Sequence, residues 1–432
     1  MLESPDMASA LLESLIGEAA TGVTAARREA ASALLRDGLP GARDEAWKYT
    51  SLRALEQRRY VDGDCGAALR TIDFDAVRLP GDSAARLLFV NGVYRADLSS
   101  AQACEGLEIG RLGGRPEDLA VALRERESIS MADGFVRLNN VLAQDGPLLR
   151  VAAGAIIEAP VHLVFVGSAA EDDVAWQLRA LIELGQRASL RVIEHHVGAS
   201  TNAHLGNLVA RYTLAAGSRL DLLQVQDAAD TITLIRRSEF RLESDAVLSM
   251  HTIEAGAQLM RHDLVVDLAG RGARFASRGV FALRGRQHAD THMVVTHNAR
   301  DTACDIVWRG VADQRARGVF HGAITVAEGA DGADAQLSNK NLLLSPHAEI
   351  DTQPVLEIYA DEVKAAHGAT VGQLDERALF YLRSRGIPLD SARRILVGAF
   401  CGAVLADIAP VELRTRIDAL LASRLPQAET LP

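Results

Sequence analysis

From about Leu148 to Gly372 the sequence repeats short segments in which apolar and polar residues alternate, with glycine, asparagine, aspartate or serine between them. Alternation with a period of two is typical of β-strands. Aligning each turn with the strand after it places four apolar residues in register, at intervals of roughly 27 to 30 residues: Leu190, Leu220, Leu248 and Phe275. Strands this short cannot each bury a face alone, so the period indicates stacked coils. We predict a parallel β-helix, although strand spacing alone leaves a jelly roll or a two-sheet sandwich as the alternative.

The residues before the repeat, 1–146, have a different pattern and are predicted to form a mixed, largely helical N-terminal domain. Apolar residues recur at helical spacing from Met7 to Leu35. A turn at Pro40-Gly41 then precedes a short helix that Asp44 can cap. Further on, two β-favouring runs flank Asn91-Gly92, which is a strong hairpin signal.

Helical spacing returns after the repeat, which we assign to residues 147–372. Three segments show this spacing: Asp375 to Arg385, Leu389 to Ala406, and Val411 to Leu425. We therefore predict a C-terminal helical domain over residues 373–432. It is expected to cap the end of the solenoid and so protect an open strand edge that would otherwise aggregate. The fold class is mainly β, with a β-helix core flanked by helical N-terminal and C-terminal domains.

Charge and hydropathy exclude several classes of partner. The formal net charge of -11 disfavours binding to nucleic acid or to an anionic membrane, because both partners would be repelled. The most apolar run, Ile395 to Leu405, is too short to span a bilayer. The first twenty residues carry acids where a secretory signal has a basic cluster. We expect a cytoplasmic protein with no nucleic-acid partner and no membrane partner.

The spacing of the cysteines and the absence of common enzyme motifs exclude several kinds of site. The four cysteines lie far apart without a CxxC pair, which excludes a disulfide framework and a self-contained all-cysteine metal site. The sequence has no GxxxxGK[ST] phosphate loop, no GxSxG elbow and no HExxH motif. Any nucleotide hydrolysis must therefore come from another chain.

Histidines suggest a metal site, since eleven of the twelve lie between His195 and His367. The best local candidate is His288, Asp290 and His292, which project from one face of a strand. Residues two apart on a strand are separated by about 6.6 Å, slightly too far to chelate one ion without bending. Solvated or hydrogen-bonded roles in the solenoid wall remain the alternative for these side chains.

Near the end of the repeat, several motifs occur in a characteristic order. They are GVFHGAI (318–324), LSNKNLLLSPHAEIDTQPVLEI from Leu337, DEVK (361–364), HGATVG (367–372) and LFYLRSRGI (379–387), and DEAWKYTSL begins at Asp44. Together they resemble the SufB/SufD core family of iron-sulfur cluster assembly scaffolds, in its SufD branch. The likeness extends from the first domain to the last helices and is weakest between about 55 and 240.

The resemblance implies a right-handed parallel β-helix and a scaffold subunit that is not an enzyme on its own. It implies pairing with a SufB-like subunit through the C-terminal part of the solenoid. It also implies docking of a SufC-like ABC ATPase on terminal helices, which would supply the ATP hydrolysis. The candidate docking residues are Phe380, Tyr381, Arg383 and Arg385.

The resemblance also assigns a site. The family's SufD histidine, held in VKxxHGAT, corresponds to His367, with Lys364, Gly368 and Thr370 in the same motif. A neutral imidazole is a sound iron ligand, and His367 would help to hold a transient iron-sulfur cluster shared with the partner subunit. The sulfur ligands would come from a cysteine of SufB. The resemblance leaves open whether a flavin takes part and whether the isolated chain forms a homodimer.

The chain differs from the family pattern at two places, and two other functions remain as alternatives. Many relatives have Cys-Ser before the histidine, whereas this chain has Ala365-Ala366. Near Leu344-Ser345, where SufB proteins carry their key cysteine, this chain has none, which argues against the SufB branch. The alternatives are a histidine-rich metal-binding β-helix protein and a polysaccharide-active β-helix enzyme. An aromatic content of only 4% speaks against the second.

Overall fold

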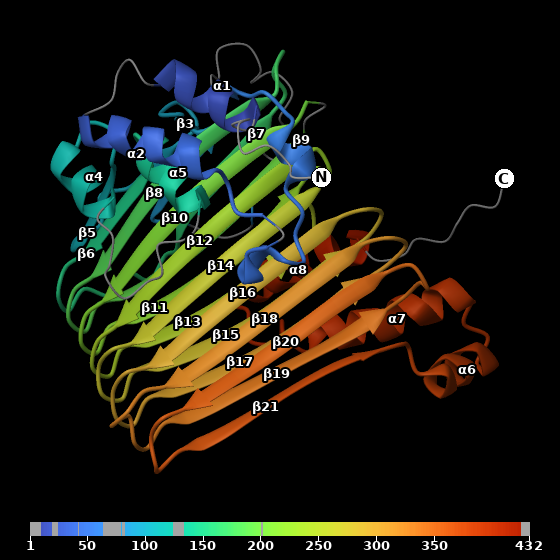
Figure 1. Cartoon of the computed structure of the whole chain (residues 1–432). Helices are drawn as coiled ribbons and strands as arrows, with labels where there is room; N and C mark the ends of the chain where they lie inside the picture. The colour runs from blue at the N-terminus through green and yellow to red at the C-terminus, as the bar shows by residue number, and fades with distance from the viewer. Residues whose placement is uncertain are drawn as a thin grey trace.

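Two long parallel β-sheets form the body of the molecule (Figure 1). The computed structural model describes residues 10–19, 25–41, 43–63, 79, 83–123, 134–199 and 202–424. Sheet A has the order β20-β18-β16-β14-β12-β10-β8-β6-β5, with β1 on β8. Sheet B has the order β21-β19-β17-β15-β13-β11-β9-β7-β2-β3, with β4 on β2. Successive strands from β6 onward alternate between the sheets, so each coil contributes one strand to each.

The strands have the following bounds. Sheet A contains β1 (Val61–Asp62), β5 (Leu107–Arg111), β6 (Pro147–Val151), β8 (Val174–Leu184), β10 (His204–Leu214), β12 (Ile232–Leu242), β14 (Leu259–Leu268), β16 (His288–His297), β18 (Arg317–Val326) and β20 (Glu349–Ile358). Sheet B contains β2 (Ala85–Val90), β3 (Val93–Tyr94), β4 (Ser100–Ala101), β7 (Val161–Ser168), β9 (Ser189–Ala199), β11 (Arg219–Ala228), β13 (Val247–Glu254), β15 (Arg274–Leu283), β17 (Ala303–Ala312), β19 (Asp334–Leu343) and β21 (Lys364–Gly372).

The register of sheet B confirms the repeat that the sequence predicts. Leu220 lies opposite Leu190 on one side and Leu248 on the other, and Leu248 lies opposite Phe275. The same column continues through Cys304 and Ala335 to Ala365. These pairs are parallel, whereas jelly rolls pair their strands antiparallel. The parallel β-helix is thus confirmed, and the jelly-roll alternative is excluded.

Stacked turns explain why glycine and aspartate recur between the strands. Gly217, Asp245, Gly272 and Asp301 all have positive φ, which glycine adopts freely and aspartate tolerates. The backbone N–H of each turn residue donates to a carbonyl in the turn of the next coil, for example from Gly217 to Ser244 at 2.8 Å. The turns therefore form a ladder of their own along the edge of the solenoid.

The N-terminal helices cover the outer face of sheet A. They are α1 (Ala10–Ala19), α2 (Ala25–Asp37), the 3-10 helix η1 (Glu45–Trp47), α3 (Arg53–Glu56), α4 (Pro116–Leu123) and α5 (Gly134–Leu142). Leucines of α1 and α5 share an apolar cluster with Leu205 and Ile235 of the sheet. The predicted hairpin is confirmed, with Val90 opposite Val93 across Asn91-Gly92. Its first strand, β2, also pairs in parallel with β7, so the first 146 residues extend the solenoid as well as cover it.

One prediction for this region is wrong in detail. Asp44 precedes η1, but its side chain makes no capping hydrogen bond to that helix. The carboxylate instead accepts a hydrogen bond from the backbone N–H of Gly41 at 2.6 Å. The turn at Pro40-Gly41 offers a nearer unpaired donor, and the carboxylate closes that turn rather than the helix.

The three C-terminal helices form close to the predicted bounds, but they do not cap the solenoid. They are α6 (Glu376–Ser384), α7 (Leu389–Gly402) and α8 (Val411–Arg424), and Asp375 caps α6 by accepting from the N–H of Arg377 at 2.8 Å. α7 and α8 pack on the outer face of sheet B, behind the strands in Figure 1. That face carries Ile193, Leu223 and Val311, whose burial favours a side position for the helices. No described helix has the length and apolar character needed to cross a bilayer.

Candidate functional site

The last coil of the solenoid has an uncovered end. β20 and β21 are the terminal strands of their sheets, at the bottom of the view in Figure 1. Ile358, Tyr359 and Val371 are exposed there, with 42%, 64% and 43% of their surface accessible. An edge strand presents a row of unpaired N–H and C=O groups, which is a template for pairing with another chain. The expected cap is absent from this part of the described chain, so the edge is available.

His367 lies on this free edge strand. It pairs with Leu337 of β19, which belongs to the buried core inside the solenoid. Paired residues of neighbouring strands share a side of the sheet, so the imidazole lies on the lumen side of β21. It is exposed because no further coil covers it. The structure therefore places the imidazole at the open end of the solenoid.

The other residues of the motif lie on the opposite side of β21. Lys364, Gly368 and Thr370 alternate with His367 and so share the outer face, where Lys364 and Thr370 are exposed. A Cβ at Gly368 would meet no atom within 4 Å, so packing within this chain does not demand glycine there. The backbone carbonyl of Thr370 accepts a hydrogen bond from Asn341 at 3.1 Å, which holds β21 to the coil beneath.

Within the described residues, thiols are poorly placed to join His367. Cys304 is buried in the lumen, where its Sγ lies 3.3 Å from His297 Nε2, and burial raises its pKa to about 12. Cys401 belongs to α7 and is buried where this helix packs on sheet B, and burial raises its pKa to about 12 as well. Cys104 is half-buried near β5, beside the first coils of the solenoid. The fourth cysteine, Cys65, lies outside the described residues.

The alternative metal residues share one face of β16, as the alternation predicts, but they bind protein groups. Asp290 accepts from Thr50 and from Arg261 Nη1 at 2.7 Å, and its other oxygen lies 3.0 Å from His292 Nε2. His288 Nε2 lies 3.0 Å from the Thr50 hydroxyl. Burial alone would raise the pKa of Asp290, but His292 and Arg261 hold it well below its usual range. No cluster of three or more metal-binding side chains occurs within the described ranges.

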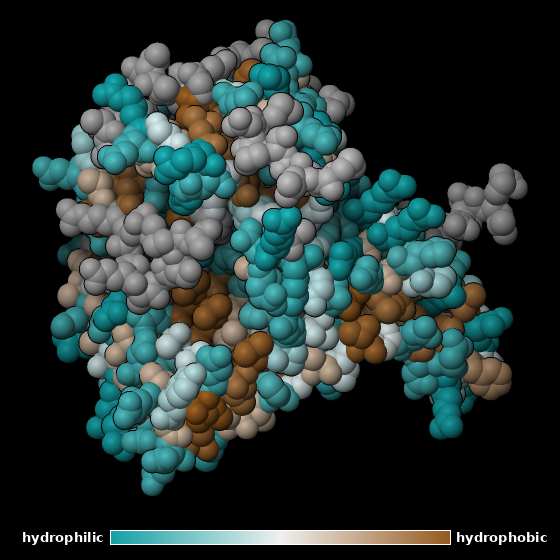
Figure 2. Space-filling model, in the orientation of Figure 1, coloured by the Kyte–Doolittle hydropathy of each residue, from teal (hydrophilic) through white to brown (hydrophobic). Residues whose placement is uncertain are grey.

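The DEAWKYTSL segment is a strap across sheet A, a role that the sequence did not reveal. Arg261 donates to the carbonyl of Ala46 at 2.7 Å, and its guanidinium lies 4.5 Å from the centre of the Trp47 ring. Beside the strap is a cleft of about 570 Å³, lined by Tyr49, Val294 and His321 among others. Figure 2 shows apolar side chains on this face of the molecule, over sheet A. In the sequence, the signal for this strap is the pattern Trp-Lys-Tyr after a turn, but the pattern does not show which surface the segment covers.

Family models and related proteins match the chain over most of its length. Residues 165–400 match the SUF system FeS cluster assembly SufBD core domain, and residues 10–163 match the SufBD protein N-terminal region. The chain belongs to the SufBD family. It is 32% identical to the iron-sulfur cluster assembly protein SufD of Escherichia coli over 399 residues, covering 91% of each chain. It is 29% identical to a SufBD family protein of Synechocystis, covering 90% of this chain and 89% of the relative. The predicted family is thus confirmed.

In this SufBD chain the helix α6 is the most exposed of the three C-terminal helices. Phe380 and Tyr381 have 74% and 57% of their surface accessible, and Arg383 and Arg385 are exposed as well. The Arg385 guanidinium lies 5.3 Å from the centre of the Tyr381 ring. Only Leu379 of this helix is buried. The four docking candidates are therefore exposed to solvent.

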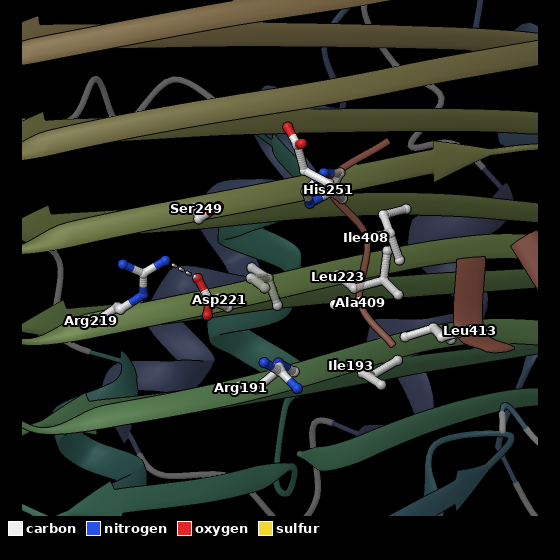
Figure 3. A pocket seen from close by; sticks show the side chains of 12 residues that line it. Arg191, Ile193, Arg219, Asp221, Leu223, Ser249, His251, Ile408, Ala409 and Leu413 are labelled. Carbon is white, nitrogen blue, oxygen red and sulfur yellow. Dashed lines mark hydrogen bonds and ion pairs between the residues drawn. The ribbon is translucent and has the colours of Figure 1, made fainter. Parts of the chain in front are cut away.

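The rest of the helical tail forms a small pocket against sheet B. The pocket has a volume of about 220 Å³ and lies between the loop that follows α7 and the strands β9, β11 and β13. Figure 3 shows Arg191, Asp221 and His251 along the strands, opposite Ile408 and Leu413 of the tail. The SufBD core model ends at residue 400, within α7, so the family's core includes the first contact of the tail with the solenoid.

Proposed function

We propose that this SufBD family member is a non-catalytic scaffold subunit, and that an iron-sulfur cluster is built at its joint with a second, SufB-like solenoid subunit. The exposed imidazole of His367, on the lumen side of an unpaired edge strand, carries the proposal. Iron and sulfide are the cargo of this site. A neutral imidazole binds iron through a ring nitrogen, and the thiolates come from the partner because the described cysteines are buried or lie elsewhere.

Strand pairing supports this joint. β20 and β21 each have one free side, and a SufB-like coil added there can continue both sheets through backbone hydrogen bonds. The exposed Ile358, Tyr359 and Val371 become buried in the same step. The same free edges would also allow two copies of this chain to pair when the partner is absent.

A flavin is not part of the proposal, because the cleft beside the strap does not fit one. The cations that line it already have acidic partners: Lys48 pairs with Glu45, and Arg261 pairs with Asp263 and Asp290. Arg237 Nε lies 2.8 Å from Glu239 in the same way. The phosphates of a flavin nucleotide would find no unpaired cation among them.

His367→Ala tests the cluster site. We expect the variant to fold and to form the complex with its SufB-like and SufC-like partners, because the imidazole contributes no buried contact. Cluster content should fall by about tenfold or more, since losing even an indirect metal partner has effects of that size. The measurement is iron and acid-labile sulfide per complex purified anaerobically after co-expression.

The matched control is His347→Ala. His347 is also exposed and lies in the turn between β19 and β20, at the same end of the solenoid. This control should retain the cluster content of the unmodified complex. Equal cluster content in the His367 variant and its control would show that the imidazole is not a ligand.

We further propose that α6 is the docking surface for the SufC-like ATPase. Deleting residues 376–432 is a blunt test, because it would also uncover the apolar outer face of sheet B. The sharper variant is Phe380→Ala with Tyr381→Ala, which removes two exposed aromatic anchors and no core contact. We expect ATPase affinity to fall by at least about tenfold, an energy that one or two anchors commonly supply. Calorimetric titration measures it.

Val411→Ala is the control for this pair. Val411 has 59% of its surface exposed on α8, so it is another exposed apolar residue of the same tail. Its replacement should leave ATPase binding unchanged. Undiminished affinity of the α6 double variant would move the docking surface elsewhere.

A further inference from the structure

The lumen of the solenoid contains a cluster of buried ionisable side chains that the proposed function does not use. They lie on the inward-facing positions of four strands, among apolar neighbours, and each has at most 2% of its surface exposed: Glu194 and His196 on β9, Arg236 on β12, Glu254 on β13 and His262 on β14. Charges buried this deeply are costly unless every polar atom is paired. The pairing of each atom therefore shows what else the lumen must hold.

Glu194 is the centre of the cluster and is fully served. Its oxygens accept from His196 Nε2 at 2.7 Å, from Tyr212 Oη at 3.1 Å and from Gln224 Nε2 at 3.3 Å, and they lie 2.9 Å from Arg236 Nη2. Burial alone would raise the pKa of Glu194, but Arg236 and His196 hold it well below its usual range. Glu194 is therefore an anion paired with the Arg236 cation.

Other atoms of the cluster, and one of the neighbouring Gln226 on β11, have no hydrogen-bond partner among the described residues. Arg236 Nε and Nη1 and Gln226 Nε2 are unmatched donors. His196 Nδ1 is unmatched as well. Burial lowers the pKa of His196 to about 4, so the ring is neutral, and its one N–H is the Nε2 donor to Glu194. Nδ1 therefore offers a lone pair and needs a donor.

The unpaired atoms include hydrogen-bond donors and one acceptor. This combination determines which molecule can bind in the lumen. An anion accepts hydrogen bonds but cannot donate one to His196 Nδ1, and it would lie beside the Glu194 carboxylate. Water both donates and accepts, and buried water typically serves polar groups that the protein leaves unpaired. Aromatic rings flank this part of the lumen. Phe165 stacks on His196 with 4.8 Å between the ring centres. Towards the open end, the ring centres of Trp308 and Phe320 are 5.2 Å apart.

Glu254 differs from Glu194 because no cation contacts it directly. Thr291 of β16 donates to its Oε2 at 2.9 Å, and His262 Nδ1 of β14 lies 3.6 Å from its Oε1. Burial raises the pKa of Glu254 to about 7. The hydrogen bond from Thr291 and the charge of Arg236 lower this pKa by less, and the charge of Asp290 raises it further. Burial also holds the pKa of His262 well below its usual range, so this ring is neutral.

We propose that the lumen between β9 and β16 is a hydrated chamber, in which ordered water molecules bind Arg236, Gln226 and His196, and that Glu254 is its exchangeable proton site. The chamber is a second polar site of the subunit, separated from His367 by the Trp308 and Phe320 rings. The chamber binds water and Glu254 binds a proton, whereas the free edge holds the iron-sulfur cluster.

A crystal structure of the full chain, with a second crystal soaked in sodium bromide, tests the guest. The expected result is water density within hydrogen-bond distance of Arg236 Nε or Nη1 and of His196 Nδ1, with no anomalous bromide peak in the lumen. A bromide peak beside Arg236 would identify an anion site and overturn the proposal. A dry lumen, with Arg236 bonded to protein acceptors, would overturn it too.

Glu254→Gln tests the proton site, with Glu243→Gln on the outside of the solenoid as the control. Infrared spectra should show the carbonyl band of a protonated carboxyl in the unmodified chain at pH 6. That band should fade as the pH rises through 7, be absent from the Glu254 variant and remain in the control. A band that persists in the Glu254 variant overturns the assignment. If the variant does not fold, the fading of the band in the unmodified chain still decides the question.

Discussion

Trp308→Ala is expected to lower the free energy of unfolding by about 3–5 kcal/mol, the range for removing a large buried aromatic side chain. Trp308 is fully buried in the lumen, and its Nε1 donates to Ser277 Oγ at 3.0 Å. Its ring fills the space above Gly279, where an added Cβ would lie 2.2 Å from the indole. The coils on both sides are fixed by strand pairing, so the cavity cannot collapse.

Urea unfolding followed by far-ultraviolet circular dichroism measures this loss without relying on tryptophan emission. Trp308→Phe is the matched control, because phenylalanine keeps most of the apolar contact and loses only the second ring and the Ser277 hydrogen bond. Its cost should be clearly smaller. A loss below about 1 kcal/mol for the alanine variant would contradict the tight packing of this coil.

Acidification from pH 7 to pH 4 should destabilise the chain by several kcal/mol. Burial, as the largest cause, lowers the pKa of six histidines, to about 3 for His195 and to about 4 for His196, His204, His288, His297 and His321. In the unfolded chain each binds a proton below about pH 6.5. Their contribution to stability is thus complete above pH 6.5 and is lost as the pH falls towards 4.

The magnitude follows from proton linkage. Each histidine removes at most about 1.4 kcal/mol per pH unit below pH 6.5, so the six together set an upper bound of roughly 20 kcal/mol at pH 4. Glu254, Asp227 and Glu56 act in the opposite direction, because burial raises their pKa values and their protonation adds stability as the pH falls, but they are three groups against six. Urea midpoints at pH 7, 6, 5 and 4.5 measure the net effect. A midpoint that stays constant from pH 7 to 5 would contradict the burial of these rings.

His204→Asn shows whether the slope arises from buried imidazoles. His204 is fully buried, so its replacement should reduce the pH dependence by one proton's share. Replacement of the exposed His347 provides the comparison, since it removes no buried imidazole.

The register of the stacked coils could be predicted because short segments of the sequence determine it. The turns before β11, β13, β15 and β17 have a glycine or an aspartate at positive φ, and these residues mark the turns in the sequence. The turn before β9 has Arg187 at that position, but the alternation of the strand after it still allowed Leu190 to be aligned with Leu220. The hairpin at Asn91-Gly92 and the capped start of α6 at Asp375 were predictable for the same reason. Each depends on residues within one turn of the chain.

Features that depend on distant surfaces could not be predicted. Helices cover both outer faces of the solenoid, so a strand such as β7 is buried on both sides and its pattern does not mark the lumen face. The sequence therefore could not show that Glu194 and His196 point inward together. It also could not show that α7 prefers the side of sheet B to the end of the solenoid, because that choice depends on Ile193 and Val311 of other coils.

Hydrogen exchange of the backbone amides, in the monomeric chain and in its complex with a SufB-like subunit, tests most directly whether a partner strand completes the His367 site. If it does, amides of β20 and β21 that exchange rapidly in the free chain become protected in the complex, while those of β10 and β12 in the middle of sheet A do not change. Unchanged exchange in β20 and β21, with protection on another surface, would contradict a joint at this edge.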